Sequence, residues 1–291
     1  MKHNSDRFGH VGRGAGAEAL NIMFLGDIVG RSGRQIVLSQ VPQLRQKLAL
    51  DFVVANGENA AGGFGINASI LEDLYEVGVD VVTLGNHAFD QREITDILPS
   101  DMRLVRPINY PAGTPGRGAT LVEGNGRNVL VINVMGRLFM DPLDDPFRMV
   151  DEALSGMELG RDADAIIVDV HAEASSEKMA MGCWLDGRVS LVVGSHTHIP
   201  TADAQILPQG TAYQTDAGMC GDYDSIIGME KTEPMNRFVT KRAQGRFQPA
   251  AGPGMLCGTF VQLSDEGLAT RIEPVRVGAR LQNYVPLLGE Q

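Results

Sequence analysis

Short runs of apolar residues alternate with amphipathic stretches along the first third of the chain. The runs at residues 22–25, 52–55 and 79–84 are typical of buried strands. Between them, residues 34–48 and 68–77 repeat their apolar positions with the spacing of a helix. This order of strands and helices predicts parallel strands that are joined by right-handed crossovers.

The rest of the chain combines further buried strands with antiparallel signals. Two strands flank Gly124-Asn125-Gly126, a strong hairpin signal, and residues 144–159 have a helical pattern that begins at Asp-Pro. Strands are predicted here at residues 119–123, 128–133, 165–168, 191–193, 211–215, 255–263 and 269–277. The expected fold class is α/β, a four-layer α/β/β/α sandwich of two mixed sheets flanked by helices.

No linker divides the chain, so we predict a single domain over residues 21–282. Residues 1–20 are rich in Gly, Arg and His and lack an apolar pattern. We therefore expect a disordered extension, in which His3 and His10 do not act as ligands. Residues 283–291 are predicted to form a tail.

The composition is that of an ordinary globular protein with an acidic character. The chain has 291 residues, of which 43% are hydrophobic and 21% charged, and a formal net charge of −11. This charge argues against a protein that tracks long nucleic acid, which requires a basic surface. It does not argue against a small phosphate ester, because bound cations would reverse the charge locally.

The apolar runs and the cysteines bear on location. No apolar run approaches the ~20 residues that span a bilayer, so no membrane partner is expected. The three cysteines are widely spaced, which favours reduced thiols in a cytoplasmic protein over a disulfide framework or a cysteine-type zinc site. The sequence leaves the oligomeric state open, a homo-oligomer included.

Five of the apolar runs are followed closely by side chains that can bind metals. Side chains at the carboxyl ends of neighbouring strands converge in an α/β protein, because the strands lie side by side. Four of the six histidines fall in these motifs. We therefore predict a single metal site from segments that are distant in the chain. The candidate side chains are Asp27, Glu58, Asn59, Asn86, His87, His171, His196 and His198.

Single members of this set have simpler explanations. An Asp after a strand, such as Asp27, is usually a helix cap, and Asn86 could form an Asx turn. Glu58 is harder to explain, because an ionised Glu at a buried strand end needs cations or donors. His196 and His198 are alternate residues, so on an extended segment both imidazoles would point the same way.

The donor atoms of this set are nitrogen and oxygen, without thiolate sulfur. Such donors favour Fe, Mn, Zn or Co. Seven ligands are too many for one tetrahedral zinc ion, so we expect two metals that share a bridging carboxylate.

The polar motifs follow one another in a characteristic order. They are Phe24-Leu25-Gly26-Asp27-Ile28-Val29-Gly30, Asn56-Gly57-Glu58-Asn59-Ala60-Ala61, Gly85-Asn86-His87, Arg106-Pro107, Leu143-Asp144-Asp145-Pro146-Phe147, Asp169-Val170-His171-Ala172-Glu173, Gly194-Ser195-His196-Thr197-His198, Thr201-Ala202-Asp203 and Thr215-Asp216-Ala217-Gly218-Met219. In this order the chain resembles the calcineurin-like metallophosphoesterase superfamily, and more closely its bacterial YmdB-type phosphodiesterases. The resemblance covers about residues 21–277.

Two departures from the superfamily pattern are themselves typical of the YmdB-type group. Val29 stands in the place of the usual His, and Glu58 replaces the usual bridging Asp. The resemblance implies two metal ions, Fe and/or Mn, with Zn also suitable. By that resemblance the first metal would be held by Asp27, Glu58, Asn59 and His198, and the second by Glu58, Asn86, His171 and His196.

The same resemblance implies a phosphodiesterase that hydrolyses cyclic nucleotides, 2′,3′-cyclic rather than 3′,5′-cyclic. A metal-bridging hydroxide would attack phosphorus, and His87 would be the general acid. The residues alone indicate only a phosphate ester. Alternatives are a phosphomonoesterase or protein phosphatase on the same site, or a catalytically weak regulatory scaffold. A two-metal nuclease is disfavoured by the acidic charge, and a 5′-nucleotidase by the lack of room for a second domain.

Several charged residues have both a functional and a structural interpretation. Arg106, Arg137 and Arg188 lie in connecting segments and could contact phosphate, or they could be solvated loop charges or structural salt bridges. Asp90 or Glu173 could orient an imidazole, or either could be a surface residue.

The shape of a substrate pocket is less well indicated. Ser175, Ser176, Cys220 and Tyr223 are expected in loops near the ligand strands and could shape a pocket. No aromatic pair that would sandwich a base is evident, and Trp184 is the single tryptophan.

Overall fold

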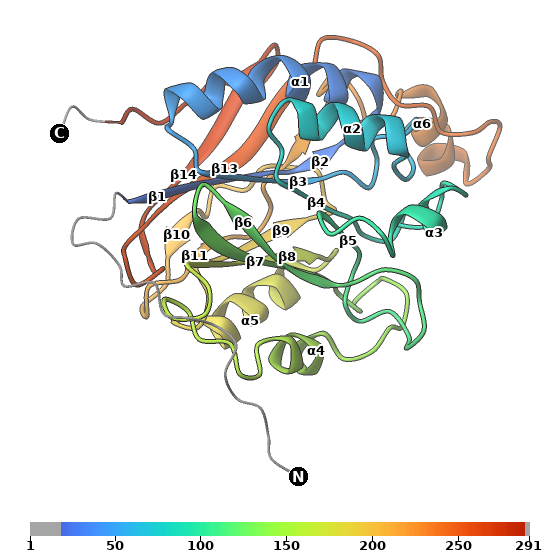
Figure 1. Cartoon of the computed structure of the whole chain (residues 1–291). Helices are drawn as coiled ribbons and strands as arrows, with labels where there is room; N and C mark the ends of the chain where they lie inside the picture. The colour runs from blue at the N-terminus through green and yellow to red at the C-terminus, as the bar shows by residue number, and fades with distance from the viewer. Residues whose placement is uncertain (1–18, 289–291) are drawn as a thin grey trace.

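Two six-stranded sheets face each other in this structure, a computed structural model that describes residues 19–288 (Figure 1). The first sheet has the strand order β14 (Ala269–Gly278), β13 (Met255–Leu263), β1 (Leu20–Leu25), β3 (Phe52–Asn56), β4 (Val81–Thr83) and β5 (Leu104–Val105). The second has the order β10 (Gln205–Ile206), β11 (Ala212–Gln214), β9 (Leu191–Ser195), β8 (Ala165–His171), β7 (Arg127–Met135) and β6 (Ala119–Gly124).

Helices cover the outer face of each sheet (Figure 1). The first sheet carries α1 (Gly30–Lys47) and α2 (Ala68–Glu76), and the second carries α4 (Pro146–Ala153) and α5 (Ser175–Leu185). The remaining short elements are α3 (Ile94–Ile97), α6 (Thr232–Thr240), β2 (Asp27–Ile28) and β12 (Met219–Cys220), of which the last two pair with each other. The predicted four-layer α/β/β/α sandwich is confirmed.

Strand residues alternate between the two faces of the first sheet. Phe24, Phe52 and Val54 belong to the apolar core that both sheets share, whereas Met23 and Val53 pack outward against the helices. Because both faces are buried, these strands appear in the sequence as continuous apolar runs. A third cluster joins the second sheet to α4 and α5.

Strand direction brings the candidate residues to one end of the sandwich. Strands β1, β3, β4 and β5 are parallel neighbours in the first sheet, and β7, β8, β9 and β11 are parallel in the second. Parallel strands end at the same edge of their sheet. The segments that follow β1, β3, β4, β8 and β9 therefore meet at one end, where polar side chains can approach from both sheets.

Two helices differ in extent from the prediction. Helix α1 begins at Gly30, four residues before the predicted start. Its first turn contains no apolar residue, so the spacing of apolar positions could not indicate it. Helix α4 is shorter than the predicted residues 144–159. Asp145 caps it by accepting from the N–H of Phe147 at 3.0 Å, and the chain has left the helix before Gly156, whose φ is 80°.

Helices α5 and α6 have no counterpart among the predicted elements. Helix α5 buries Glu177 and Lys178 but exposes Trp184, and α6 leaves Phe238 and Val239 exposed. Buried polar residues and exposed apolar ones reverse the pattern on which helix prediction depends.

The predicted ends of the domain fall partly within the described residues. The predicted extension, including His3 and His10, lies outside them except for its last two residues, and Leu20 already begins β1. In the predicted tail, the N–H of Tyr284 donates to the Arg276 carbonyl of β14 at 2.8 Å. Within residues 19–288, no helix is long and apolar enough to cross a membrane.

Candidate metal centre

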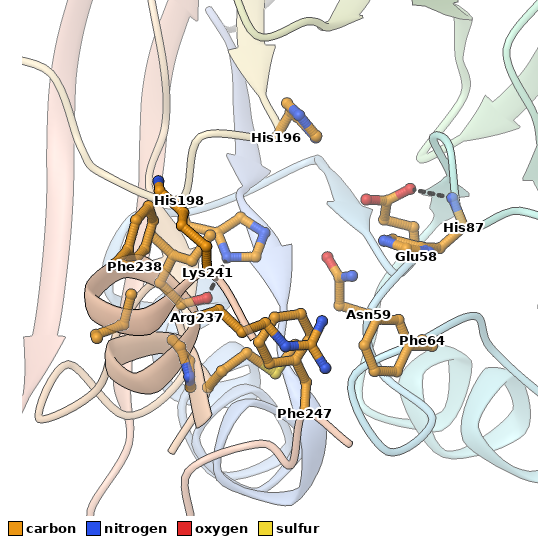
Figure 2. Close-up of a pocket in the computed structure, with 14 residues that line it drawn as sticks. Glu58, Asn59, Phe64, His87, His196, His198, Arg237, Phe238, Lys241 and Phe247 are labelled. Carbon is orange, nitrogen blue, oxygen red and sulfur yellow. Dashed lines mark hydrogen bonds between the residues drawn. The ribbon is translucent and has the colours of Figure 1, made fainter. Parts of the chain in front are cut away.

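The predicted ligands come together at the carboxyl ends of the strands of the two sheets, and Figure 2 shows four of them, Glu58, Asn59, His196 and His198. Ligand atoms of Glu58, His171 and His196 lie within 4.8 Å of one another, although they come from three separate segments. The first sheet contributes the side chains that follow β1, β3 and β4, and the second contributes those at the ends of β8 and β9. Asp27, Asn86 and His198 lie within 4 Å of this group or of one another, and Asn59 lines a cavity beside them.

One half of the site contains Asp27, Asn59 and His198. His198 Nε2 lies 3.7 Å from Asp27 Oδ1, and His198 Nδ1 donates to the Ile227 carbonyl at 2.7 Å. That bond leaves Nε2 of a neutral ring with a free lone pair. The Oδ1 atoms of Asp27 and Asn59 are buried and have no hydrogen-bond partner. Buried unpaired oxygens are costly, and a bound cation would satisfy them.

The other half is arranged around His171. Its Nε2 lies 3.1 Å from Glu58 Oε1, 3.0 Å from Asn86 Oδ1 and 3.1 Å from His196 Nδ1. Its Nδ1 lies 2.9 Å from Ser195 Oγ, which fixes the orientation of the ring. Three atoms that can bind a metal surround this one ring nitrogen. A single N–H can donate to only one of them with good geometry, so the arrangement fits a shared cation better than a set of hydrogen bonds.

The pKa shifts indicate that this site attracts positive charge. Burial alone would lower the pKa of His171, but the Glu58 and Asp27 carboxylates raise it to about 9. Burial alone would raise the pKa of Glu58, but the His171 ring lowers it to about 2. Burial raises the pKa of Asp27 to about 6 against the opposing effect of the imidazoles. The donor set and its electrostatics therefore fit metal cations, which would supply this charge without a protonated ligand.

His196 and His198 reach the site by a different route from the predicted one. Strand β9 ends at Ser195, and the two histidines have φ values of 90° and 67°, so they lie in a turn rather than on an extended strand. Two buried residues from other segments stabilise this turn. Asp216 accepts from the Thr197 N–H at 3.1 Å, and the buried Lys178 ammonium pairs with Asp216 at 2.8 Å.

His87 lies beside the converging donors. Its backbone N–H donates to Glu58 Oε2 at 2.9 Å, and its ring Nδ1 lies 2.7 Å from Asp90 Oδ2. This contact occupies Nδ1, so Nε2 is the ring nitrogen that remains for a ligand. Glu173 lies 3.2 Å from Nε2 of His196. Both acidic residues that could orient an imidazole thus contact one.

The three candidate arginines have structural partners instead of facing the site. Arg106 donates to backbone carbonyls, including that of Pro107 at 2.7 Å. Arg188 pairs with Asp151 at 2.8 Å. Arg137 lies 3.5 Å from a carboxylate oxygen of the helix-capping residue before α4. The structural interpretation therefore holds for each of them.

Two of the expected pocket loops are regular elements. Ser175 and Ser176 begin helix α5, and Cys220 belongs to β12. Tyr223 does lie in a loop, where its hydroxyl contacts the His198 carbonyl at 3.2 Å. It therefore supports the backbone of the histidine turn.

A cavity of about 550 Å³ opens beside the converging donors (Figure 2). Its lining includes Glu58, Asn59, His87, His196 and His198. The same cavity is lined by aromatic and cationic side chains that the sequence did not indicate. The one available signal was an Arg-Phe pair that occurs twice within α6 and the loop that follows it. These side chains are Phe64, Arg237, Phe238, Lys241 and Phe247.

The fold and the position of the donors define the class of protein. Two mixed sheets packed face to face, with helices outside and polar residues at the carboxyl ends of their strands, form the fold that the resemblance to metallophosphoesterases implied, and a phosphatase 32% identical to this chain shares it. A model of the YmdB-like protein family matches residues 23–275. The chain belongs to that family.

Similar proteins cover nearly the whole chain. It is 46% identical over 259 residues to the 2′,3′-cyclic-nucleotide 2′-phosphodiesterase of Bacillus subtilis strain 168, with coverage of 89% of this chain and 97% of that protein. A hypothetical protein from Thermus thermophilus is 46% identical, with a TM-score of 0.84 over 90% of this chain and 100% of that one. A novel phosphatase from Mycoplasma pneumoniae is 32% identical, with a TM-score of 0.83 over 90% and 94%.

Gly85 tests whether the converging donors bind metal. A Cβ at this position would lie 2.3 Å from both Glu58 Oε2 and His171 Nε2. We expect Gly85→Ala to displace both side chains and to weaken metal binding by at least ~10-fold, the loss typical of disturbed ligand positions. Metal content after dialysis, measured by mass spectrometry, checks this. Gly221→Ala is the matched control, since its Cβ meets nothing closer than 3.4 Å. Equal metal content in both variants would contradict the assignment.

Proposed function

We propose that this protein is a metal-dependent phosphodiesterase that opens 2′,3′-cyclic nucleotides, with 3′,5′-cyclic nucleotides as poorer substrates. The observation that carries the proposal is the convergence of nitrogen and oxygen donors from both sheets beside an open cavity. The name of the Bacillus subtilis relative supports the substrate class. The bond to the 2′ oxygen would break, and the product would be a nucleoside 3′-phosphate.

The donors divide into two overlapping sets around Glu58. The proposed ions are Fe and/or Mn, with Zn as the alternative, because the donors lack sulfur. When bound, two such ions act as Lewis acids toward phosphate oxygens and make water a nucleophile at neutral pH. One set is Asp27, Glu58, Asn59 and His198, and the other is Glu58, Asn86, His171 and His196.

The chain itself supplies the proton for the leaving group. The 2′ alkoxide is a poor leaving group unless it is protonated as the P–O bond breaks. His87 Nε2 is available for this transfer, because Asp90 holds Nδ1 at 2.7 Å. Its backbone N–H also holds Glu58 Oε2 at 2.9 Å. The residue that donates the proton is therefore tied to the carboxylate that both donor sets share.

The electrostatics of the cavity suit an anionic diester despite the net charge of −11. Bound cations would offset the buried carboxylates of Asp27 and Glu58. Lys241 adds positive charge to the cavity lining, whereas the charge of Arg237 is paired with Glu233 at 2.6 Å. A small phosphodiester would thus meet positive charge from the bound cations and from Lys241, while a long polyanion would meet an acidic surface.

A substrate panel with metal-loaded protein tests the proposal. We expect 2′,3′-cyclic AMP to be hydrolysed faster than 3′,5′-cyclic AMP and faster than p-nitrophenyl phosphate, a monoester. Glu58→Gln should lose metal and activity together, because the shared carboxylate loses its charge. Glu72→Gln, on the exposed face of α2, is the control and should behave like the wild type. A monoester preference would identify a phosphatase instead.

His87 can be tested separately from the metals. General acids typically contribute ~10²–10⁴-fold to rate, so His87→Ala should lower kcat for 2′,3′-cyclic AMP by about that range. Metal content should stay that of the wild type, since His87 touches the shared carboxylate only through its backbone N–H. Unchanged turnover, or metals lost together with activity, would remove His87 from this role.

A further inference from the structure

Three phenylalanines, Phe64, Phe238 and Phe247, line the cavity that also contains the histidines, and together they form its aromatic wall. Helix α6 and the loop after it bring Arg237, Phe238 and Phe247 to the cavity, and Phe64 approaches from the segment after β3 (Figure 2). None of these side chains serves the proton transfer or the metal binding described above. Phe238 is 69% exposed and lines the cavity, so its ring is accessible to a ligand.

Phe247 is held in place by a network within this segment. The Arg237 guanidinium carbon lies 4.0 Å from the centre of the Phe247 ring. Arg237 Nε donates to Glu233 at 2.6 Å, and the Gln244 N–H donates to the same carboxylate at 3.1 Å. A second guanidinium nitrogen donates to the Gly245 carbonyl at 2.9 Å. The loop is therefore fastened to α6, and the Phe247 ring is positioned before any ligand arrives.

Phe64 connects the aromatic wall to the reaction end of the cavity. Its ring packs edge-to-face against the His87 ring, with a centroid distance of 5.0 Å and an interplanar angle of 77°. Its backbone carbonyl accepts from the Gln91 amide at 2.7 Å. A ligand group that contacts Phe64 is therefore next to the proposed proton donor.

The phenylalanines suit a flat ring, and the neighbouring donors suit a phosphate ester, so the cavity fits a ligand that contains both. Aromatic side chains bind nucleobases by stacking, which is worth ~1–3 kcal/mol per base and tolerates any base because each has a π face. The volume of about 550 Å³ falls within the ~300–1,000 Å³ of pockets that enclose small organic ligands.

We propose that Phe64, Phe238 and Phe247 form a nucleobase subsite, positioned so that a base bound there directs the ribose phosphate toward the histidines. This inference rests on the proposed phosphodiesterase function. Arg237 is a positioning residue that keeps Phe247 in place. Because phenylalanine rings offer stacking faces without hydrogen-bond readout, the subsite accepts all four bases with little discrimination.

Two cyclic diesters with and without a base separate this role from the reaction itself. The probes are 2′,3′-cyclic AMP and glycerol 1,2-cyclic phosphate, which carries the same five-membered cyclic phosphate but no base. We expect Phe247→Ala to raise KM for 2′,3′-cyclic AMP by ~5–150-fold, the range that corresponds to base stacking. kcat/KM for glycerol 1,2-cyclic phosphate should change less than about twofold.

Matched variants separate the loss of stacking from damage to the fold. Phe247→Tyr should restore the wild-type KM for 2′,3′-cyclic AMP, whereas Phe247→Leu should restore it in part, because Leu has bulk without a π face. Trp184→Ala, on α5 outside the cavity, should leave both substrates unaffected. Equal losses on both diesters, or an unchanged KM for 2′,3′-cyclic AMP in Phe247→Ala, would overturn the subsite.

A binding measurement decides the question even without turnover. Calorimetry with adenosine 3′-phosphate should show affinity for the metal-loaded wild type, and at least fivefold weaker affinity for Phe247→Ala. If wild type cleaves neither diester but this difference is present, the proposed function fails and the subsite stands. If both proteins bind adenosine 3′-phosphate equally, the subsite is wrong whatever the hydrolysis result.

Discussion

Two buried carboxylates constrain this molecule more than any other feature. Asp27 is 0% and Glu58 is 1% exposed, and they lie two residues after the ends of β1 and β3. A buried carboxylate destabilises the fold unless cations or hydrogen-bond donors compensate it. The imidazole of His171 supplies part of that compensation, at 3.1 Å from Glu58. The unpaired Oδ1 of Asp27 shows that the side chains alone do not complete it.

The surrounding architecture holds these groups together against their mutual repulsion. The inter-sheet core keeps the ends of both sheets in contact, and Gly85 leaves room for Glu58 and His171 to meet, where any Cβ would collide with both. His196 and His198 have positive φ values, which residues other than glycine rarely adopt. The buried pair of Lys178 and Asp216 supports the turn that contains them. Such strain is tolerated where the neighbouring structure enforces it, and functional sites are where it concentrates.

Sequence reasoning succeeded where one local pattern determines the outcome. The buried strands are visible as continuous apolar runs because both sheet faces are covered, and parallel strands necessarily end together, so the meeting of Glu58 with His171 could be predicted. The route of His196 and His198 could not, because their turn depends on Lys178 and Asp216 from other elements. Their role as ligands remains a proposal.

The aromatic wall of the cavity could not be predicted from the sequence for a related reason. Helix α6 exposes its apolar residues, so it lacks the pattern of a packed helix. Arg237 in α6 contacts Phe247 in the loop that follows, and the spacing of apolar residues cannot indicate such a contact. The sequence offered three arginines as candidates for phosphate contact, but in the folded chain each has another partner. They are Arg106, Arg137 and Arg188.

Anomalous X-ray diffraction from crystals of the manganese-loaded protein would show how many ions the Glu58 carboxylate contacts. We expect two separate anomalous peaks, both within coordination distance of this carboxylate. Asp27 and His198 would contact one peak, and His171 and His196 the other. A loaded crystal with a single peak, or with peaks remote from Glu58, would contradict the claim that this carboxylate joins two metal ions.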